Sequence, residues 1–370
     1  MYKCKYFIMA ILLLSNLVLG SSMRIAALGG KAGFWPEDDQ NIFLFPSTMH
    51  NFNLVQINGI MDPENELLED NWPNDLFSSA TFLFGDKTKY GFMLTPAYDY
   101  NSGDYVAAPP LANFAFGKGK WGVLIGLNRN ASETPSVDST GASSTSNASD
   151  LNLTTRFGME MGFGLIGTNF NLSSSDNGDG DSDNDPSSMN LSLTVRRDQK
   201  LWEFSHLLFG FSFSSSSQGP ASTSGLGLNL DLFRHWELNE KTDLLFATGF
   251  SFTTSTSNTG ASGAKDQTTT KIALPSYTLA VESYLLDWAT ARVGIVSDHW
   301  LTNSFDNGDS KTSSSGFGNY DINFGLGLDY GGFALDLDLN PGLFVNPVNY
   351  ITGNNLTSPL ATMATMTFTW

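Results

Sequence analysis

Apolar and polar residues alternate one by one along much of the chain, most clearly near its C-terminal end. Between residues 319 and 330 every second side chain is apolar, as at Phe324, Leu326 and Leu328, while Asn, Asp or Gly occupies the positions between them. Only a β-strand places every second residue on one face. Helical periodicity is scarce, and no apolar run of about 18 residues follows the first twenty. The pattern therefore predicts an all-β protein.

Sixteen segments have the composition or the alternation of strands. They are 52–60, 77–84, 90–97, 111–117, 121–128, 151–161, 164–173, 188–196, 203–215, 225–235, 243–255, 269–285, 289–302, 317–329, 332–340 and 360–370. Long connections rich in Ser, Thr, Asn and Asp alternate with short turns, which is typical of outer-membrane barrels. Many segments approach the ~9–11 residues that a tilted strand needs to cross a bilayer. We therefore expect a closed antiparallel transmembrane β-barrel of about 14 to 16 strands, the alternative being a secreted β-sandwich.

The two ends of the chain carry signals for export and for membrane assembly. Lys3 and Lys5 precede an apolar run that ends in small residues, so residues 1–20 are expected to be a signal peptide cleaved after Gly20. The last residues alternate up to the aromatic Trp370. Bacterial outer-membrane barrels commonly end this way, and their last strand resembles the signal read by the barrel-assembly machinery. We expect a multi-pass protein of the bacterial outer membrane, with its lipid and that machinery as partners.

Composition excludes several classes of function. Without the signal peptide the chain has 17 Lys and Arg against 37 Asp and Glu, a net charge of −20, which argues against nucleic acid as a partner. The only cysteine, Cys4, lies in the signal peptide, so we expect no disulfide and no thiolate site. The four histidines fit no zinc motif and no catalytic triad pattern. Neither an enzyme nor a resident cofactor is predicted.

The segment that follows the predicted cleavage point carries a family resemblance. It reads Met-Arg-Ile-Ala-Ala-Leu-Gly-Gly from residue 23 and Pro-Glu-Asp-Asp-Gln-Asn-Ile-Phe-Leu-Phe-Pro-Ser from residue 36. This resembles the start of the long-chain fatty-acid transporter (FadL-like) outer-membrane family and its relatives in type IX secretion. Phe45 and Ser47 depart from the Asn-Pro-Ala of that family, whose barrel has fourteen strands.

The resemblance implies that residues 21–50 form a plug inside a barrel of residues 51–370. By this resemblance the residues that would help to form the plug are Arg24, Gly29, Gly30, Asp38, Asp39, Pro46 and Ser47. It also implies passive transport of small hydrophobic molecules across the outer membrane. Two alternatives stay open: a barrel without transport that acts as a surface scaffold or secretion component, and a general porin that favours cations.

Charged residues fall on the polar face of the predicted strands, which would line the lumen if the apolar face meets lipid. They are Arg156, Glu160, Arg196, Asp231, Glu282, Arg292, Asp298, Asp321, Asp329, Asp336 and Asp338. These groups could pair across the barrel and rigidify it, or bias a pore towards cations.

One long connection is a dense tract of acidic residues. Asp179, Asp181 and Asp183 alternate with small polar residues, so their carboxylates could converge on one Ca²⁺ ion. The tract could equally be a solvated acidic loop, because it has no bidentate Glu at a matching distance.

Overall fold

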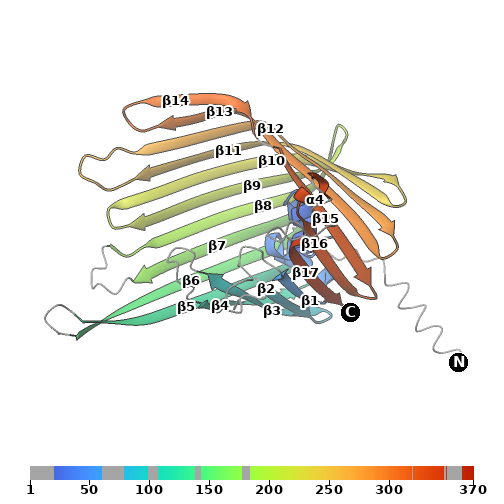
Figure 1. The fold of residues 1–370 in the computed structure, drawn as a ribbon, viewed down its shortest axis with the longest axis horizontal. Coiled ribbons are helices and arrows are strands. Elements are labelled where there is room, and N and C mark those ends of the chain that lie inside the picture. Colours follow the sequence, from blue (N-terminus) through green and yellow to red (C-terminus); the bar gives the residue numbers. More distant parts are fainter. Residues whose placement is uncertain are drawn as a thin grey trace.

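The computed structural model describes residues 21–60, 79–98, 107–137, 143–176, 184–318, 320–345, 347 and 361–370. Its strands form one antiparallel sheet that closes on itself, because β1 pairs with β2 on one side and with β17 on the other (Figure 1). The predicted all-β barrel is therefore confirmed. Among the described helices, none has the length and apolar character to cross a membrane. The predicted signal peptide lies outside the described residues.

Seventeen strands are described, and they occupy sixteen positions around the barrel. They are β1 (Leu54–Ile60), β2 (Ser79–Phe84), β3 (Thr88–Tyr98), β4 (Ala107–Lys118), β5 (Trp121–Val137), β6 (Ser143–Met161), β7 (Gly164–Asp176), β8 (Ser187–Leu201), β9 (Phe204–Gln218), β10 (Ala221–Asn239), β11 (Thr242–Asn258), β12 (Gln267–Leu286), β13 (Ala289–Asp306), β14 (Lys311–Phe317), β15 (Asp321–Tyr330), β16 (Phe333–Leu339) and β17 (Ala361–Thr369). β14 and β15 share one position, since each pairs with a different part of β13.

The alternation of the sequence separates the two faces of the barrel wall. On β10, Leu226 to Leu232 point outward at every second position, and the apolar band ends at Trp236, three residues before the end of the strand at Asn239. Ten steps of ~3.3 Å along a strand tilted by about 40° cover ~25 Å, the height of the apolar band of outer-membrane barrels. Leu230 keeps 40% of its surface exposed although it lies in mid-strand. A closed barrel with such an outer band is the architecture of outer-membrane proteins.

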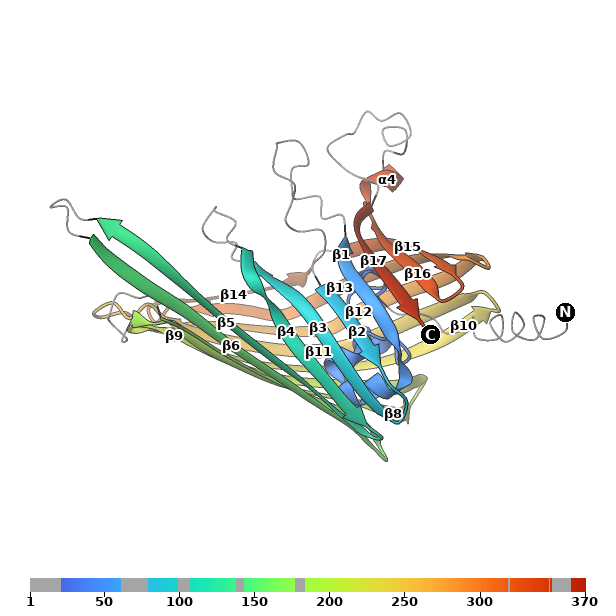
Figure 2. The same ribbon diagram turned by 90° about the horizontal axis from the view of Figure 1, so that it is seen from below.

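Several strands extend well beyond this apolar band. Residues 129–150, expected as a long loop, instead include the distal halves of β5 and β6, which stay paired as far as Val137 and Ser143 (Figure 2). Residues 216–224, also expected as a loop, belong to β9 and β10 apart from a tight turn at Gly219 and Pro220. In residues 214–224 Ser and Thr occupy both faces, so the hydrophobic alternation that marks a membrane strand disappears while the backbone pairing continues.

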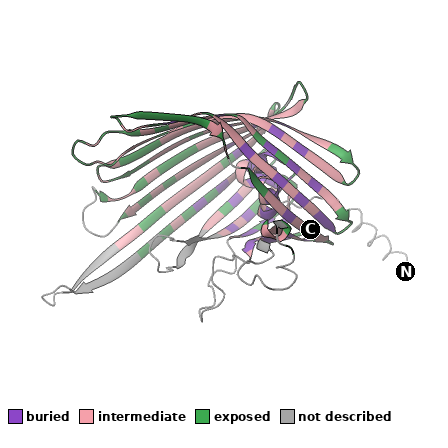
Figure 3. Ribbon diagram, turned by 45° about the horizontal axis from the view of Figure 1, so that its top comes forward, coloured by how far each residue is buried: buried purple, intermediate pink, exposed green. Residues whose placement is uncertain are grey.

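Residues 21–51, called the N-terminal segment below, form four short helical turns within the barrel (Figure 1). They are α2 (Ser22–Ala27), η1 (Ala32–Phe34), α3 (Asn41–Leu44) and η2 (Pro46–Asn51). A further short helix, α4 (Gly342–Val345), follows β16. Buried residues concentrate around the N-terminal segment, whereas the distal strand ends are intermediate or exposed (Figure 3).

Two apolar clusters join this segment to the wall. In the first, Phe34 and Phe45 pack with Phe233 and Leu245 of β10 and β11. In the second, Met49 packs with Leu83 of β2 and other side chains of β1, β3, β4 and β5. The core of the protein thus lies between the segment and the inner face of the barrel.

Candidate functional site

The N-terminal segment is attached to the wall through a buried arginine. The Ser21 hydroxyl accepts the Arg24 backbone N–H at 3.0 Å and begins helix α2, which directs the guanidinium of Arg24 toward β12. The Nε and Nη2 groups of Arg24 donate to the two carboxylate oxygens of Glu282, at 2.9 and 2.7 Å. Its Nη1 group donates to Asp38. Only 4% of the Arg24 side chain is exposed, so these bonds replace nearly all of its hydration.

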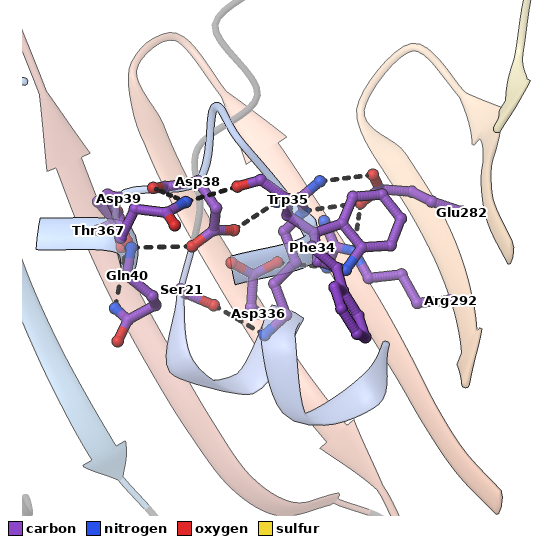
Figure 4. Close-up of polar contacts among 12 residues, drawn as sticks. Ser21, Phe34, Trp35, Asp38, Asp39, Gln40, Glu282, Arg292, Asp336 and Thr367 are labelled. Atoms are coloured by element: carbon purple, nitrogen blue, oxygen red, sulfur yellow. Dashed lines mark hydrogen bonds and ion pairs between the residues drawn. The ribbon is translucent and has the colours of Figure 1, made fainter. Parts of the chain in front are cut away.

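Glu282 continues this ion network into two further strands (Figure 4). Arg292 of β13 donates its Nε–H to Glu282 at 2.6 Å, and its Nη1 group donates to Asp336 of β16. The side chains of Glu282 and Asp336 are each 3% exposed. Buried charges of this kind are stable only while every partner remains, because an ion left alone keeps its full desolvation cost. The network therefore ties Arg24 and Asp38 to three strands of the wall.

A second polar group surrounds the carboxylate of Asp39. It accepts hydrogen bonds from the side-chain amides of Gln40 at 3.1 Å and of Gln56 at 3.0 Å. The same Gln56 amide also donates to Thr367 of β17 at 3.0 Å. Burial raises the pKa of Asp38 to about 6 and the pKa of Asp39 well above its usual value. Both acids of the Asp-Asp pair thus take up protons more readily when the segment is in place.

Arg196 of β8 makes a separate connection to the segment. Its Nη1 group donates to the side-chain carbonyl of Asn41 at 3.0 Å and to the backbone carbonyl of Gly33 at 3.3 Å. Its guanidinium lies 5.1 Å from the centre of the Phe45 ring. Arg156 of β6 is placed in the same way, 5.5 Å from the centre of the Phe43 ring.

Glycines of the wall allow the backbone of the segment to approach closely. A Cβ atom on Gly167 would lie 1.8 Å from the carbonyl oxygen of Leu44, and one on Gly158 would lie 2.5 Å from the nitrogen of Pro46. On the segment itself, Gly29 and Gly30 have φ of 96° and 81°, a left-handed region that favours glycine. A side chain at Gly158 or Gly167 would separate the segment from the wall.

Six of the charged residues predicted for the lumen lie in or beside these contacts. Arg156 and Arg196 contact the segment directly, Glu282, Arg292 and Asp336 belong to the ion network, and Asp231 pairs with Lys31 at 3.2 Å. The others lie apart. Glu160 is near Lys120 at a turn, Asp298 pairs with Lys271, Asp321 is exposed, and Asp329 and Asp338 lie on β15 and β16.

The residues named from the family resemblance also differ in their surroundings. Arg24, Asp38 and Asp39 are bonded as described above, Pro46 begins η2, and Ser47 is buried with no hydrogen-bond partner for its hydroxyl among the described residues. The candidate calcium ligands Asp179, Asp181 and Asp183 lie outside the described residues. The part of the chain that the structure describes holds no cluster of three metal-ligating side chains.

Sequence reasoning missed three residues that hold the segment. They are Lys31, Gln56 and His235, whose imidazole Nε2 is 2.7 Å from the carbonyl oxygen of Phe34. Gln56 and Asn58 are two residues apart in an otherwise apolar strand, so both point to the same face of it. This alternation was the signal in the sequence that could have identified Gln56. Lys31 and His235 have no such signal, because their partners are about two hundred residues away in the sequence.

Two cavities adjoin the segment on the inside of the barrel. The larger, of about 590 Å³, lies between the segment and strands β8, β9 and β10 and has the apolar side chains of Ile25, Phe43 and Leu208 in its lining. The smaller, of about 220 Å³, is lined mainly by polar residues of β10 to β13 and β15. Lys31 and Asn229 line both.

Comparisons with known proteins find similarity only among solved structures. No protein-family description matches the chain, and no curated protein matches it. An outer-membrane protein of Vibrio cholerae, OmpT, aligns at 10% identity and TM-score 0.33 over 86% of this chain and 98% of its own. The toluene transporter TodX of Pseudomonas putida aligns at 11% identity and TM-score 0.26, covering 87% and 83% of the two chains. TbuX, a toluene transporter of Ralstonia pickettii, gives 11% identity and TM-score 0.27 over 87% and 86%. At these values the assignment of the fold depends on the strand pairing of the chain itself.

Proposed function

We propose that this protein is an outer-membrane transport barrel whose N-terminal segment is a plug, and that small hydrophobic molecules cross the membrane through it passively. The observation that carries the proposal is the buried network of Arg24, Asp38, Glu282, Arg292 and Asp336. A segment with no role in closing the lumen would need no such set of desolvated charges, since apolar packing alone stabilises a wall at lower cost.

The larger cavity supports the choice of small hydrophobic molecules. Its volume of about 590 Å³ falls within the range of about 300–1,000 Å³ that is usual for small-molecule sites. Apolar side chains from the segment and from β9 form part of its lining, as Phe43, Leu44 and Leu208 do. A molecule bound there touches the plug itself, so it favours movement of the plug if it binds the displaced form more tightly than the docked form.

Planar-bilayer recording tests the proposal. We expect the full-length protein to give almost no steady conductance and Arg24→Met to open it, because the buried acids then lose their cation. Arg234→Met is the matched control, since Arg234 pairs with the exposed Glu203 and does not touch the segment. Deletion of residues 21–51 should give the largest conductance. A deletion variant that still blocks current would refute the transport role.

A second candidate function follows from the polar parts of the long strands. Beyond the apolar band, hydroxyls of neighbouring strands bond to each other, as Thr254 with Thr270 at 3.3 Å and Thr256 with Thr268 at 3.1 Å. Such a rigid wall outside the membrane would suit a surface scaffold. That function predicts no conductance in any variant, whereas a general porin predicts large conductance in the unaltered protein.

A further inference from the structure

The two cavities beside the N-terminal segment meet at the same two side chains. Lys31 and Asn229 belong to the lining of both, so the two cavities are neighbours on the inside of the barrel. The larger cavity is partly apolar. The smaller cavity is lined by the hydroxyls of Ser251 and Ser276 and by three carboxylates. A ligand that uses both must be amphipathic.

The charges of the smaller cavity select the polar end of that ligand. Lys31 Nζ lies 3.2 and 3.4 Å from the two carboxylate oxygens of Asp231, so its charge is already balanced. Asp298 is balanced in the same way by Lys271 at 2.7 Å. Asp321 forms no ion pair within the described part of the chain, and its side chain is exposed. The cavity therefore has one negative charge in excess.

We propose that these two neighbouring cavities together bind one amphipathic amine, with the apolar body against Ile25, Phe43 and Leu208 and the ammonium group beside Asp321. The proposal rests on the transport function proposed above and specifies the class of its ligand. An ammonium group donates three hydrogen bonds, and the cavity offers carboxylate and hydroxyl oxygens to accept them. A carboxylate head would instead meet Asp321 with a like charge and find Lys31 already engaged.

Three probes with the same six-carbon chain separate these possibilities. Hexylamine, hexanol and hexanoate are titrated calorimetrically at pH 7 into the full-length protein in lipid nanodiscs, and the heat with empty nanodiscs is subtracted. We expect affinity to fall in the order hexylamine, hexanol, hexanoate. Hexylamine and hexanol have the same apolar chain and hexanoate has one methylene fewer, so the comparison of hexylamine with hexanol reports the head group directly.

Variants assign the two ends of the ligand to the two cavities. Asp321→Asn should weaken hexylamine about fivefold, the upper range for a solvent-accessible ion pair, and leave hexanol unchanged. Asp287→Asn, in the turn between β12 and β13 and away from both cavities, is the matched control and should change nothing. Ala26→Phe fills part of the larger cavity and should weaken all three probes alike.

Two results would overturn the proposal: hexanoate binding more tightly than hexylamine, or hexylamine affinity that stays the same in either Asp321→Asn or Ala26→Phe. These outcomes are distinct from failure of the transport function. If Arg24→Met opens a conductance while hexylamine fails these tests, the plug stands and the ligand class is wrong. If no variant conducts, the transport function is refuted whatever the probes bind.

Discussion

Replacing Arg24 by Met should release the N-terminal segment from the wall. The Arg24 guanidinium makes two hydrogen bonds to Glu282 and one to Asp38, and all three side chains are almost fully buried. Removing one member of a buried ion network costs about 3–5 kcal/mol, because the remaining charges stay desolvated. Glu282 keeps Arg292 at 2.6 Å, and Asp38 can take up a proton, so we expect the lower end of this range.

A loss of about 3 kcal/mol lowers the ratio of docked to undocked segment about 150-fold. Hydrogen–deuterium exchange measures this ratio directly at the amides of helix α2. The N–H of Ile25 is bonded to the carbonyl of Ser21, and that of Leu28 to the carbonyl of Arg24, and both are exposed to exchange once the segment leaves the wall. Arg234→Met removes an exposed ion pair away from the segment and should change the free energy of undocking, measured by exchange, by less than about 1 kcal/mol.

The double variant Arg24→Met with Glu282→Gln separates loss of charge balance from loss of packing. The neutral amide oxygen of Gln can still accept a hydrogen bond from Arg292, and the network then holds one negative charge fewer. Part of the protection should therefore return. The free energy of undocking is obtained from the exchange rates. If its value in Arg24→Met lies within about 0.5 kcal/mol of that in the unaltered protein, the network does not anchor the segment.

Three further predictions concern proton uptake, close approach and the membrane position. Burial raises the pKa of Asp38 to about 6, so the docked segment binds a proton at Asp38 more tightly than the undocked segment does. Docking should therefore strengthen as the pH falls from 8 to 5, and the conductance should be lower at pH 5. Asp38→Asn should reduce this pH dependence. Gly167→Ala should displace the segment and raise conductance, because its Cβ would collide with a backbone carbonyl, whereas Gly162→Ala has open space and should have no effect. Leu230→Arg should destabilise the folded barrel in lipid by about 2–4 kcal/mol in urea unfolding, and Ser224→Arg, beyond the apolar band of the same strand, by less than about 1 kcal/mol. Equal costs at both positions would contradict the placement of the band.

The barrel could be predicted because its signal is local. Phe324, Leu326 and Leu328 face outward while Gly325 and Gly327 face the interior, and period-two alternation alone establishes this. The same alternation along their strands placed Glu282, Arg292 and Asp336 on the inner face of the barrel wall. Strand number was predicted well because each turn interrupts the pattern.

Strand length and the partners of the segment could not be predicted in this way. Beyond Phe213, strand β9 continues with Ser on both faces, so no hydrophobic contrast marks its course as far as Gln218. The pairing of Arg24 with Glu282 joins positions 258 residues apart. It depends on the register of every intervening strand and on the path of the segment inside the closed barrel, and neither has a local signature.

A reversible covalent tether tests most directly whether the segment closes the barrel. The hydroxyls of Ser22 and Thr365 are 3.0 Å apart, and the only cysteine of the chain is Cys4 in the predicted signal peptide, so Ser22→Cys and Thr365→Cys can form one defined disulfide. The tether is introduced into the Arg24→Met protein, and single-channel current is recorded before and after reduction. We predict that the oxidised protein stays closed and that the reductant opens it. The same conductance in both states would contradict the central claim.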